Sequence, residues 1–352
     1  MEPAVTGTST LTGVSISSLA LMKLVQHGTR SLPELCAGSL LGLDDGEGKL
    51  DVTNCFPYPS VSSMTAAAFA EDGEELDASQ IESDISDFRH DYMRLLRDCQ
   101  SSDDFSVGWY RTVNMGDWCT LDIVEQQYEH QEECDAQTGK AKSVLVIYDP
   151  YQTENGVLAI KALRLTDAFM DVMRVRLSSD PKHMSASDVA LAQMKMGDVF
   201  YEIPIDFTSG STLAARAVEQ FAPLAETVRF DRLVLDPNPK LEKNLAFAVE
   251  ELEHLKSEAQ NGANFQKFMI KQKQQQEFWI AQRKQENLQR EKRGEEPLPL
   301  RDLSLSFFKT YRDASKLNTL LIRKQIQVYC EQIDEAANNS FEKLHLLGAL
   351  QQ

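Results

Sequence analysis

The sequence has no clustered metal ligands and no disulfide framework. None of its six cysteines belongs to a C-x-x-C pair, and its six histidines are scattered along the chain. A secreted disulfide scaffold would be a short, cysteine-dense chain. In a reducing compartment, isolated cysteines are small buried hydrophobes or surface thiols. The composition therefore predicts neither disulfides nor a bound cofactor; the cysteines are Cys36, Cys55, Cys99, Cys119, Cys134 and Cys330.

Long hydrophobic runs are also missing. The chain has no stretch of about 18 apolar residues, the length that a transmembrane helix needs. The first ten residues, MEPAVTGTST, have neither the basic start nor the apolar stretch of a signal peptide. We therefore expect a cytoplasmic protein without a membrane span. Hydrophobic residues make up 42% of the 352 residues, enough for a sizeable core and about two domains.

Basic residues are outnumbered by acidic ones, and the net charge is −18. This balance argues against general nucleic-acid binding, because contacts with phosphates dominate that affinity. The charge is uneven, since residues 271–293 carry seven bases, three acids and two aromatic side chains. One interpretation is an RNA-facing helix. We favour the other, a solvated helix that packs through Phe265, Phe268, Met269, Trp279 and Ile280.

Strand and helix patterns alternate up to about residue 210. The apolar runs at 35–43 and 50–56 flank the turn-forming residues DDGEGK and predict a hairpin. A hairpin within an alternating pattern predicts an α/β (α+β) fold with a mixed sheet flanked by helices. Other strands are expected at 14–16, 105–110, 144–148, 157–165 and 199–207, and helices from Ser17 or Ser18 to Gly28, at 79–96, at 121–132 and after Thr166.

The composition changes after Pro239, where the chain becomes rich in Glu, Gln, Lys and Leu. Strand patterns disappear from this point. We expect an all-α C-terminal helical arm, with helices at 240–260, 263–293 and 314–347. The glycine and two prolines within 294–299 must interrupt it.

One stretch carries the most informative motif. Val107-Gly-Trp-Tyr110 is followed by Arg111-Thr-Val-Asn-Met-Gly-Asp-Trp118 and preceded by Gly38-Ser-Leu-Leu-Gly42. This combination resembles the MPN fold, a family that includes zinc-dependent isopeptidases. In active members, two histidines after the Gly-Trp-Tyr and a later aspartate bind the zinc. Such a site keeps one open position for a catalytic water.

The positions of those ligands hold other residues here. Arg111 and Val113 stand where the two histidines are expected, and ungapped counting places Val124 at the aspartate position, with Asp122 nearby. The position of the general-base glutamate holds Leu35. The resemblance therefore implies a pseudoenzyme that lacks the zinc ligands and has no catalytic, cofactor-binding or metal-binding residues.

Further runs carry a narrower resemblance over about residues 14–351: LDVTNCFPYP at 50–59, SVLVIYDP at 143–150, KALRLT at 161–166, QENLQR at 285–290, RGEEPLP at 293–299 and LLIRKQIQVYC at 320–330. They are similar to the family of H-type subunits of eukaryotic translation initiation factor three. This resemblance implies a non-catalytic scaffold whose MPN domain pairs with that of the F-type MPN subunit. It also implies a C-terminal helix in a bundle of several subunits, within a complex that recruits mRNA and initiator tRNA to the small ribosomal subunit.

These resemblances set the expected domain organisation. It consists of a disordered N-terminus at 1–13, an MPN domain at 14–170, an MPN extension at 171–235 and a helical assembly region at 236–352. The acidic insert at 60–78 matches the family poorly, so nothing is carried over to it.

The helix at 79–96 carries the first candidate subunit interface. Ser79 and Glu82 form a capping box at its start. Its apolar face contains Ile81, Ile85, Phe88, Tyr92 and Leu95, at spacings of four and three. Either the chain's own sheet or a sister MPN domain must cover this face. We select Ile85 and Phe88 as interface candidates.

The C-terminal helix carries the second candidate interface. Apolar residues recur at intervals of four and three, which is typical of a helix-packing seam. We predict that this seam packs into helices of other subunits; the alternative is an antiparallel hairpin within the chain. Its members are Ile322, Ile326, Tyr329, Ile333, Ala336, Ser340, Leu344 and Leu347, widened by Leu317, Leu321 and Phe341.

Three alternatives to the scaffold function stay open. An MPN-type zinc isopeptidase, deubiquitinating-like, would need ligands that the motif lacks. The chain could instead be a subunit of another lid-type complex. Direct RNA contact through 271–293 would have to overcome the negative charge of the whole chain.

Overall fold

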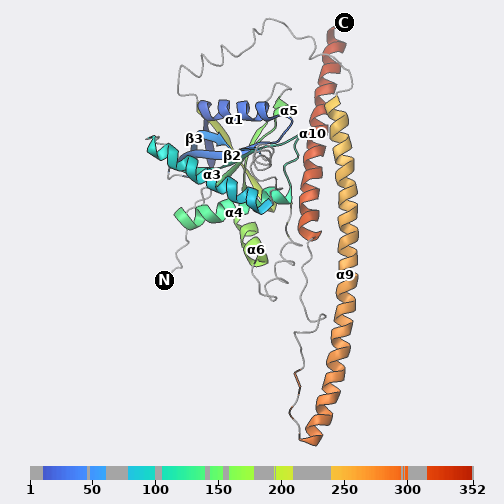
Figure 1. The fold of residues 1–352 in the computed structure, drawn as a ribbon. Coiled ribbons are helices and arrows are strands. Elements are labelled where there is room, and N and C mark those ends of the chain that lie inside the picture. The colour runs from blue at the N-terminus through green and yellow to red at the C-terminus, as the bar shows by residue number, and fades with distance from the viewer. Residues whose placement is uncertain are drawn as a thin grey trace, which may run out of the picture.

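The strands build one eight-stranded mixed sheet, and two long helices follow it in sequence (Figure 1). This arrangement confirms the predicted fold class. The computed structural model describes residues 11–45, 48–60, 78–99, 105–138, 143–153, 158–177, 194, 196–208, 239–294, 296, 298–299 and 315–350. Residues 1–10 and most of the acidic insert lie outside this part. Among the described helices, none is both long and apolar enough to cross a membrane.

The sheet follows the order β7-β6-β5-β4-β2-β3-β1-β8. The predicted hairpin is confirmed, because β2 and β3 pair antiparallel. The pairs β4–β5, β1–β3 and β1–β8 are parallel, so the sheet is mixed as predicted. The strands are β1 (Gly13–Ser17), β2 (Ala37–Asp44), β3 (Lys49–Pro57), β4 (Ser106–Thr112), β5 (Val144–Tyr148), β6 (Ile160–Leu165), β7 (Phe200–Ile203) and β8 (Ile205–Thr208).

Pro204 joins the two edges of the sheet. It alone separates β7 from β8, which lie at opposite ends of the strand order. Its carbonyl oxygen accepts a hydrogen bond from the backbone N–H of Val14 at 3.0 Å. The prediction of one strand over 199–207 is therefore wrong, because proline cannot donate to a ladder and interrupts it.

Alternate side chains of the strands enter two separate cores. Tyr110, Val146 and Tyr148 belong to a core on the side of α1, whereas Trp109 and Leu145 belong to the core of α4 and α6. The second core also includes Leu317, Leu320, Leu321 and Val328 of α10. The helices are α1 (Ser18–Ser31), α3 (Ala78–Asp98), α4 (Leu121–Thr138), the short α5 (Pro150–Thr153), α6 (Asp167–Leu177), the 3₁₀ turn η1 (Met196–Asp198), α9 (Pro239–Arg293) and α10 (Ser315–Leu350).

Helix α1 begins where predicted but ends later. The Ser17 hydroxyl accepts a hydrogen bond from the backbone N–H of Ala20, which confirms the cap. Gly28 does not end the helix; it lies buried inside it. A Cβ at this position would come within 2.8 Å of the Tyr148 ring and 3.0 Å of Thr112. The glycine is therefore explained by the close packing of α1 on the sheet. It does not mark the end of the helix.

Helix α3 packs through a face slightly rotated from the predicted one. Met93 is buried against Leu41 and Phe56, with Tyr92 and Leu96 partly buried beside it. Phe88 is 36% exposed and Leu95 57% exposed, so both lie at the outer edge. The chain's own sheet therefore covers only part of this helix. The side chains of the predicted capping box and of Ile81 lie outside the described residues.

The two long helices form an antiparallel hairpin (Figure 1). Helix α9 runs unbroken through residues 261–262, so the predicted break there is wrong, because a single glycine weakens a helix by only about 1 kcal/mol. Gly294, with a φ of 76°, ends α9 as predicted. The Phe247 and Tyr329 rings stack across the hairpin at 6.1 Å. Two alternatives were open for the C-terminal seam. The intramolecular hairpin accounts for the first half of α10, up to Tyr329.

Candidate functional site

The motif residue Arg111 forms an ion pair across the end of the sheet. It lies on β4, and its guanidinium donates a hydrogen bond to the carboxylate of Asp122 in the first turn of α4. The other Asp122 oxygen accepts a hydrogen bond from Gln126 at 3.2 Å. The pair is partly open to solvent, with 24% of the Arg111 side chain and 56% of the Asp122 side chain exposed. A cation of the protein therefore already compensates this carboxylate.

Two of the neighbouring motif positions are occupied by core residues. Val113 and Val124 are 1% and 0% exposed and belong to the core under α4. Leu35 precedes β2 and is 49% exposed. Within the described residues, no group of three or more His, Cys, Asp or Glu side chains could hold a metal ion.

The loop between β4 and α4 turns sharply at Met115 and Gly116, whose φ angles are 52° and 86°. Gln325 lies on α10, is 2% exposed and makes two hydrogen bonds to the backbone of this loop. Its amide nitrogen donates to the Gly116 carbonyl at 2.8 Å, and its amide oxygen accepts from the Cys119 backbone N–H at 3.1 Å. Helix α10 therefore completes the loop that follows the motif, although more than 200 residues separate them in sequence.

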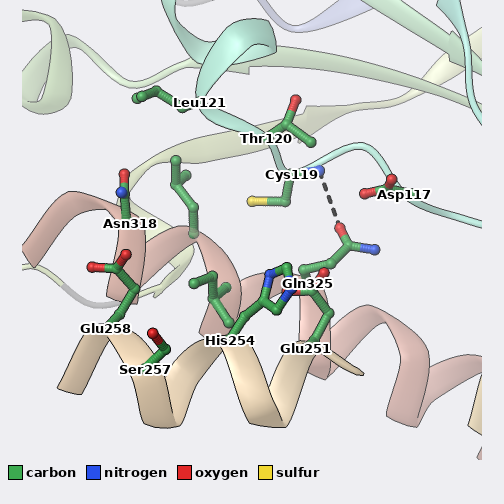
Figure 2. Close-up of a pocket in the computed structure, with 12 residues that line it drawn as sticks. Asp117, Cys119, Thr120, Leu121, Glu251, His254, Ser257, Glu258, Asn318 and Gln325 are labelled. Atoms are coloured by element: carbon green, nitrogen blue, oxygen red, sulfur yellow. Dashed lines mark hydrogen bonds between the residues drawn. The ribbon is translucent and has the colours of Figure 1, made fainter. Parts of the chain in front are cut away.

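A cleft of about 440 Å³ opens where this loop meets α9 and α10 (Figure 2). Asp117, Cys119, Glu251 and His254 are among its lining residues. Burial raises the pKa of the Asp117 and Glu251 carboxyls. The charges of Arg111 and His254 oppose this rise at Asp117 and Glu251 respectively, and neighbouring carboxylates add to it. Burial also raises the pKa of the Cys119 thiol to about 12. A pKa in this range keeps the thiol in its protonated form at neutral pH, whereas the thiolate is the nucleophilic form of cysteine.

The motif residues Trp109 and Tyr110 make structural contacts. The Trp109 indole N–H donates to Gln127 at 2.8 Å, and Tyr110 shares a 2.8 Å hydrogen bond with His27. His130 stacks on Trp109 with ring centroids 5.6 Å apart. Burial, aided by the charge of Arg89, lowers the pKa of His130 to about 4. Trp109 and Tyr110 thus anchor the two separate cores, and His130 and His27 pack beside them.

Known proteins with a similar sequence are consistent with this fold. The family model described as the C-terminal region of eIF3h matches residues 153–352, and the one described as JAB1/Mov34/MPN/PAD-1 ubiquitin protease matches residues 9–136. The H-type subunit of eukaryotic translation initiation factor 3 from Arabidopsis thaliana is 33% identical over 339 residues, which cover 96% of this chain and 92% of that protein.

This chain belongs to the eIF3h family, the H-type subunits of eukaryotic translation initiation factor 3. The eIF3h of Nematostella vectensis is 32% identical, with 96% of this chain and 94% of that protein covered. One of the Danio rerio relatives, of type H-B, is 30% identical, with 96% and 93% covered.

The structure distributes the candidate interface residues of this eIF3h-family chain over two surfaces. Ile85 is half-buried on α3 near the exposed edge formed by Phe88. On α10, Ile322, Ile326 and Ile333 are half-buried, and Tyr329 is only 3% exposed. The prediction that Tyr329 faces other subunits needs correction, because Phe247 covers its ring within the chain.

The end of α10 is different. Phe341, Leu344 and Leu346 are 70%, 51% and 54% exposed. The Leu347 side chain lies outside the described residues. Apolar side chains are therefore open to solvent along the last turns, where Figure 1 shows α10 extending past the start of α9.

Sequence patterns indicate neither Gln325 nor the cleft. A glutamine within a helix rich in polar residues stands out from none of its neighbours, and its partners are backbone groups of a distant loop. Nothing in the spacing of residues shows which side chain binds the turn at Met115 and Gly116.

Proposed function

We propose that this chain is a non-catalytic scaffold subunit of translation initiation factor 3, a pseudoenzyme that lacks the MPN zinc ligands. Membership of the eIF3h family supports the role in translation initiation. By resemblance, the complex helps recruit mRNA and initiator tRNA to the small ribosomal subunit. This chain would act there in the cytoplasm.

The observation that carries the non-catalytic part is the environment of Arg111. Its guanidinium is a permanent cation with no lone pair to offer a metal, and it already binds Asp122. Val113, at the second histidine position of the resemblance, is an aliphatic core residue. A catalytic zinc site needs three protein ligands and an open position. One paired carboxylate does not meet that requirement.

The exposed apolar edges support the scaffold part. We propose that the outer edge of α3, with Ile85 and Phe88, faces the MPN domain of the F-type partner. The exposed end of α10, with Phe341 and Leu344, would enter the helical bundle of the complex. The division into an MPN domain at 14–170, an extension at 171–235 and an assembly region at 236–352 is part of this proposal, with the first half of α10 packed on the domain.

Metal content and peptidase activity test the pseudoenzyme. Purified full-length protein, dialysed against zinc and then against buffer, should contain far less than one zinc per chain and should not cleave a ubiquitin dimer. Asp122→Asn is the matched variant, because it removes, at almost constant size, the carboxylate closest to the expected aspartate position. One zinc per wild-type chain, lost in Asp122→Asn, would overturn the proposal.

A further inference from the structure

The second half of α9 is set apart from the rest of the molecule. Asn318 of α10 lines the cleft together with Ser257 and Glu258 of α9, so α10 begins beside the middle of α9. Figure 1 shows α9 continuing from there past the start of α10 and away from the sheet. We call residues 262–293 the projecting half.

Charge is segregated along α9 at the same point. The projecting half contains eight lysines and arginines against three glutamates, a net charge of +5. Residues 239–261 contain three basic and five acidic residues, and the whole chain carries −18. The projecting half is therefore a local positive region on an otherwise acidic protein, and such a region attracts a polyanion.

One side of the projecting half is covered. Phe265, Met269, Trp279 and Ile280 are half-buried and Gln272 is 5% exposed, as the packing interpretation of this stretch predicts. The side-chain amide of Asn287 makes two 2.8 Å hydrogen bonds with the backbone of Leu298 on this same side. Phe268, expected to pack here as well, is instead 46% exposed.

The opposite side, which we call the outer face, is exposed throughout. With 3.6 residues per turn, it consists of Lys267, Ile270, Lys271, Gln274, Phe278, Ala281, Gln285, Leu288 and Lys292. Phe278 is 73% exposed, the largest exposure among the chain's described large hydrophobic residues. The set contains three lysines and no acidic residue. It extends over about 38 Å of helix.

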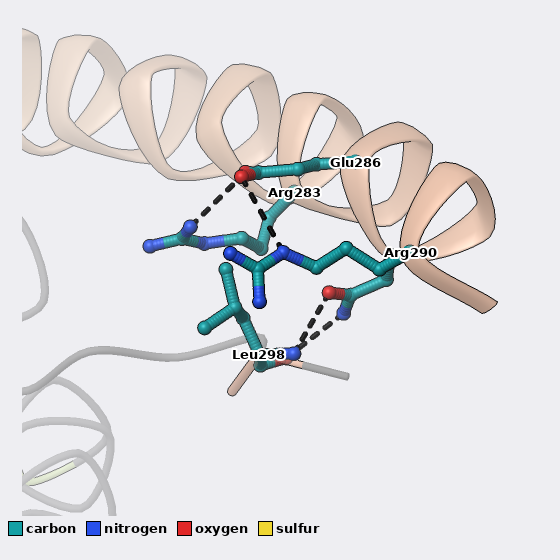
Figure 3. Close-up of polar contacts among 5 residues, drawn as sticks. Arg283, Glu286, Arg290 and Leu298 are labelled. Atoms are coloured by element: carbon teal, nitrogen blue, oxygen red, sulfur yellow. Dashed lines mark hydrogen bonds and ion pairs between the residues drawn. The ribbon is translucent and has the colours of Figure 1, made fainter. Parts of the chain in front are cut away.

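One of the three glutamates of the projecting half is neutralised within the helix. Glu286 lies between Arg283 at 3.1 Å and Arg290 at 3.9 Å, as Figure 3 shows. The Arg283 guanidinium also stacks over the Trp279 ring at 4.7 Å. These arginines are occupied by partners within the helix. The lysines of the outer face supply the positive charge that a ligand would meet.

We propose that the outer face binds single-stranded RNA, with its lysines on phosphates and Phe278 stacked on a base. A row of basic groups with an exposed aromatic ring is the combination that binds single strands without sequence preference. A partner helix fits less well, because Gln274, Gln285 and Lys292 would interrupt a continuous apolar seam. This site is independent of the scaffold function and of the metal-free motif.

Salt-dependent binding of a labelled RNA tests the lysines. The probe is a fluorescein-labelled single-stranded RNA of about 12 nucleotides and mixed sequence, measured by anisotropy with the full-length protein. Replacing Lys267, Lys271 and Lys292 by Gln should lower the slope of log Kd against log salt by about 2 and weaken binding about 100-fold at 0.1 M salt. Lys161, Lys243 and Lys256 are exposed lysines elsewhere, and replacing these three by Gln gives the same change of net charge. Equal losses in the two triple variants would overturn the proposal.

Variants of Phe278 test whether the ligand of the outer face is RNA or an acidic protein segment. Phe278→Ala should weaken RNA binding roughly 5- to 100-fold at an unchanged salt slope, because stacking carries no charge. Phe278→Tyr should restore it and Phe278→Leu should not. If Phe278→Leu binds as the wild type does, or if poly-L-glutamate displaces the RNA at equal charge concentration, the outer face takes acidic peptides and the RNA proposal is wrong.

Discussion

Arg111 and Asp122 form an ion pair between the end of β4 and the start of α4, two positions at or near which active MPN relatives would place zinc ligands. The pair satisfies the carboxylate without a metal. Because both side chains are partly exposed, it stabilises the fold only weakly, by about 1 kcal/mol or less. Its main consequence is chemical, because the Asp122 carboxylate is engaged by a cation of the protein, as the proposed pseudoenzyme requires.

Gln325 should be essential for holding α10 on the domain. Gln325→Leu keeps the size of the side chain but leaves the Cys119 N–H without the glutamine acceptor and removes one of the two hydrogen bonds to the Gly116 carbonyl, which keeps the bond from the Trp118 N–H at 3.0 Å. We expect a loss of about 2–4 kcal/mol in the free energy of unfolding, measured by urea denaturation. Gln327→Leu, at an exposed position two residues later, should change it by less than about 0.5 kcal/mol. Similar stabilities of the two variants would show that the contact is unimportant.

Two glycines in helices should respond to alanine in opposite directions. Gly28→Ala would force a methyl group against Tyr148, so we expect a destabilisation of about 1–3 kcal/mol despite the better helix propensity of alanine. Gly348 lies in α10 with nothing within 4 Å of a Cβ. Gly348→Ala should therefore be neutral or slightly stabilising. Thermal melts of both variants decide this, and a stabilised Gly28→Ala protein would contradict the packing.

The stability of the domain should fall in mild acid because of His130. Its pKa is about 4 in the folded state against 6.5 unfolded, so the unfolded chain binds more protons between these values. The contribution of His130 to the free energy of unfolding is fully present above pH 6.5. It is lost as the pH falls towards 4, which lowers the free energy of unfolding by roughly 3 kcal/mol. His130→Phe, which keeps a ring over Trp109, should be less sensitive over this range. An identical pH profile for wild type and variant would contradict the assignment.

The two halves of α10 should behave differently when charged. Phe341→Asp with Leu344→Asp changes exposed residues, so the chain should stay folded but enter the initiation factor complex poorly. Tyr329→Asp places a charge in a buried site and should lower the stability of the isolated chain by at least about 3 kcal/mol. Circular dichroism melts and co-sedimentation on sucrose gradients separate the two effects. Normal complex entry of the doubly charged variant would show that the end of α10 is no interface.

Local patterns predict most of the elements, because periodicity and capping act over a few residues. The hairpin of β2 and β3, the Ser17 cap and the end of α9 at Gly294 all follow from neighbouring residues. Tertiary contacts decide the rest. Gly28 resembles a helix end in sequence because its packing partner, Tyr148, is 120 residues away. Strands β7 and β8 flank Pro204 in the chain but lie at opposite ends of the sheet. No local sequence pattern predicts that the two strands separate in this way.

The seam on α10 also shows that local patterns do not identify tertiary contacts. Apolar spacing indicates that the helix packs, but not against what. The structure places Leu317, Leu321 and Val328 in the core of the sheet domain and Tyr329 against α9, leaving only the last turns open. Deleting the whole helix would therefore remove part of the domain core, and point substitutions at its end are the cleaner test of assembly.

The most direct test of the scaffold assignment is the composition of the complex that forms around this chain. The tagged full-length protein would be purified from cells under gentle conditions, and its partners quantified by mass spectrometry. We predict the other subunits of translation initiation factor 3 in near-equal amounts, with the F-type MPN partner among them. Recovery of the protein alone, or in equal amounts with components of a ubiquitin-processing assembly, would contradict this account.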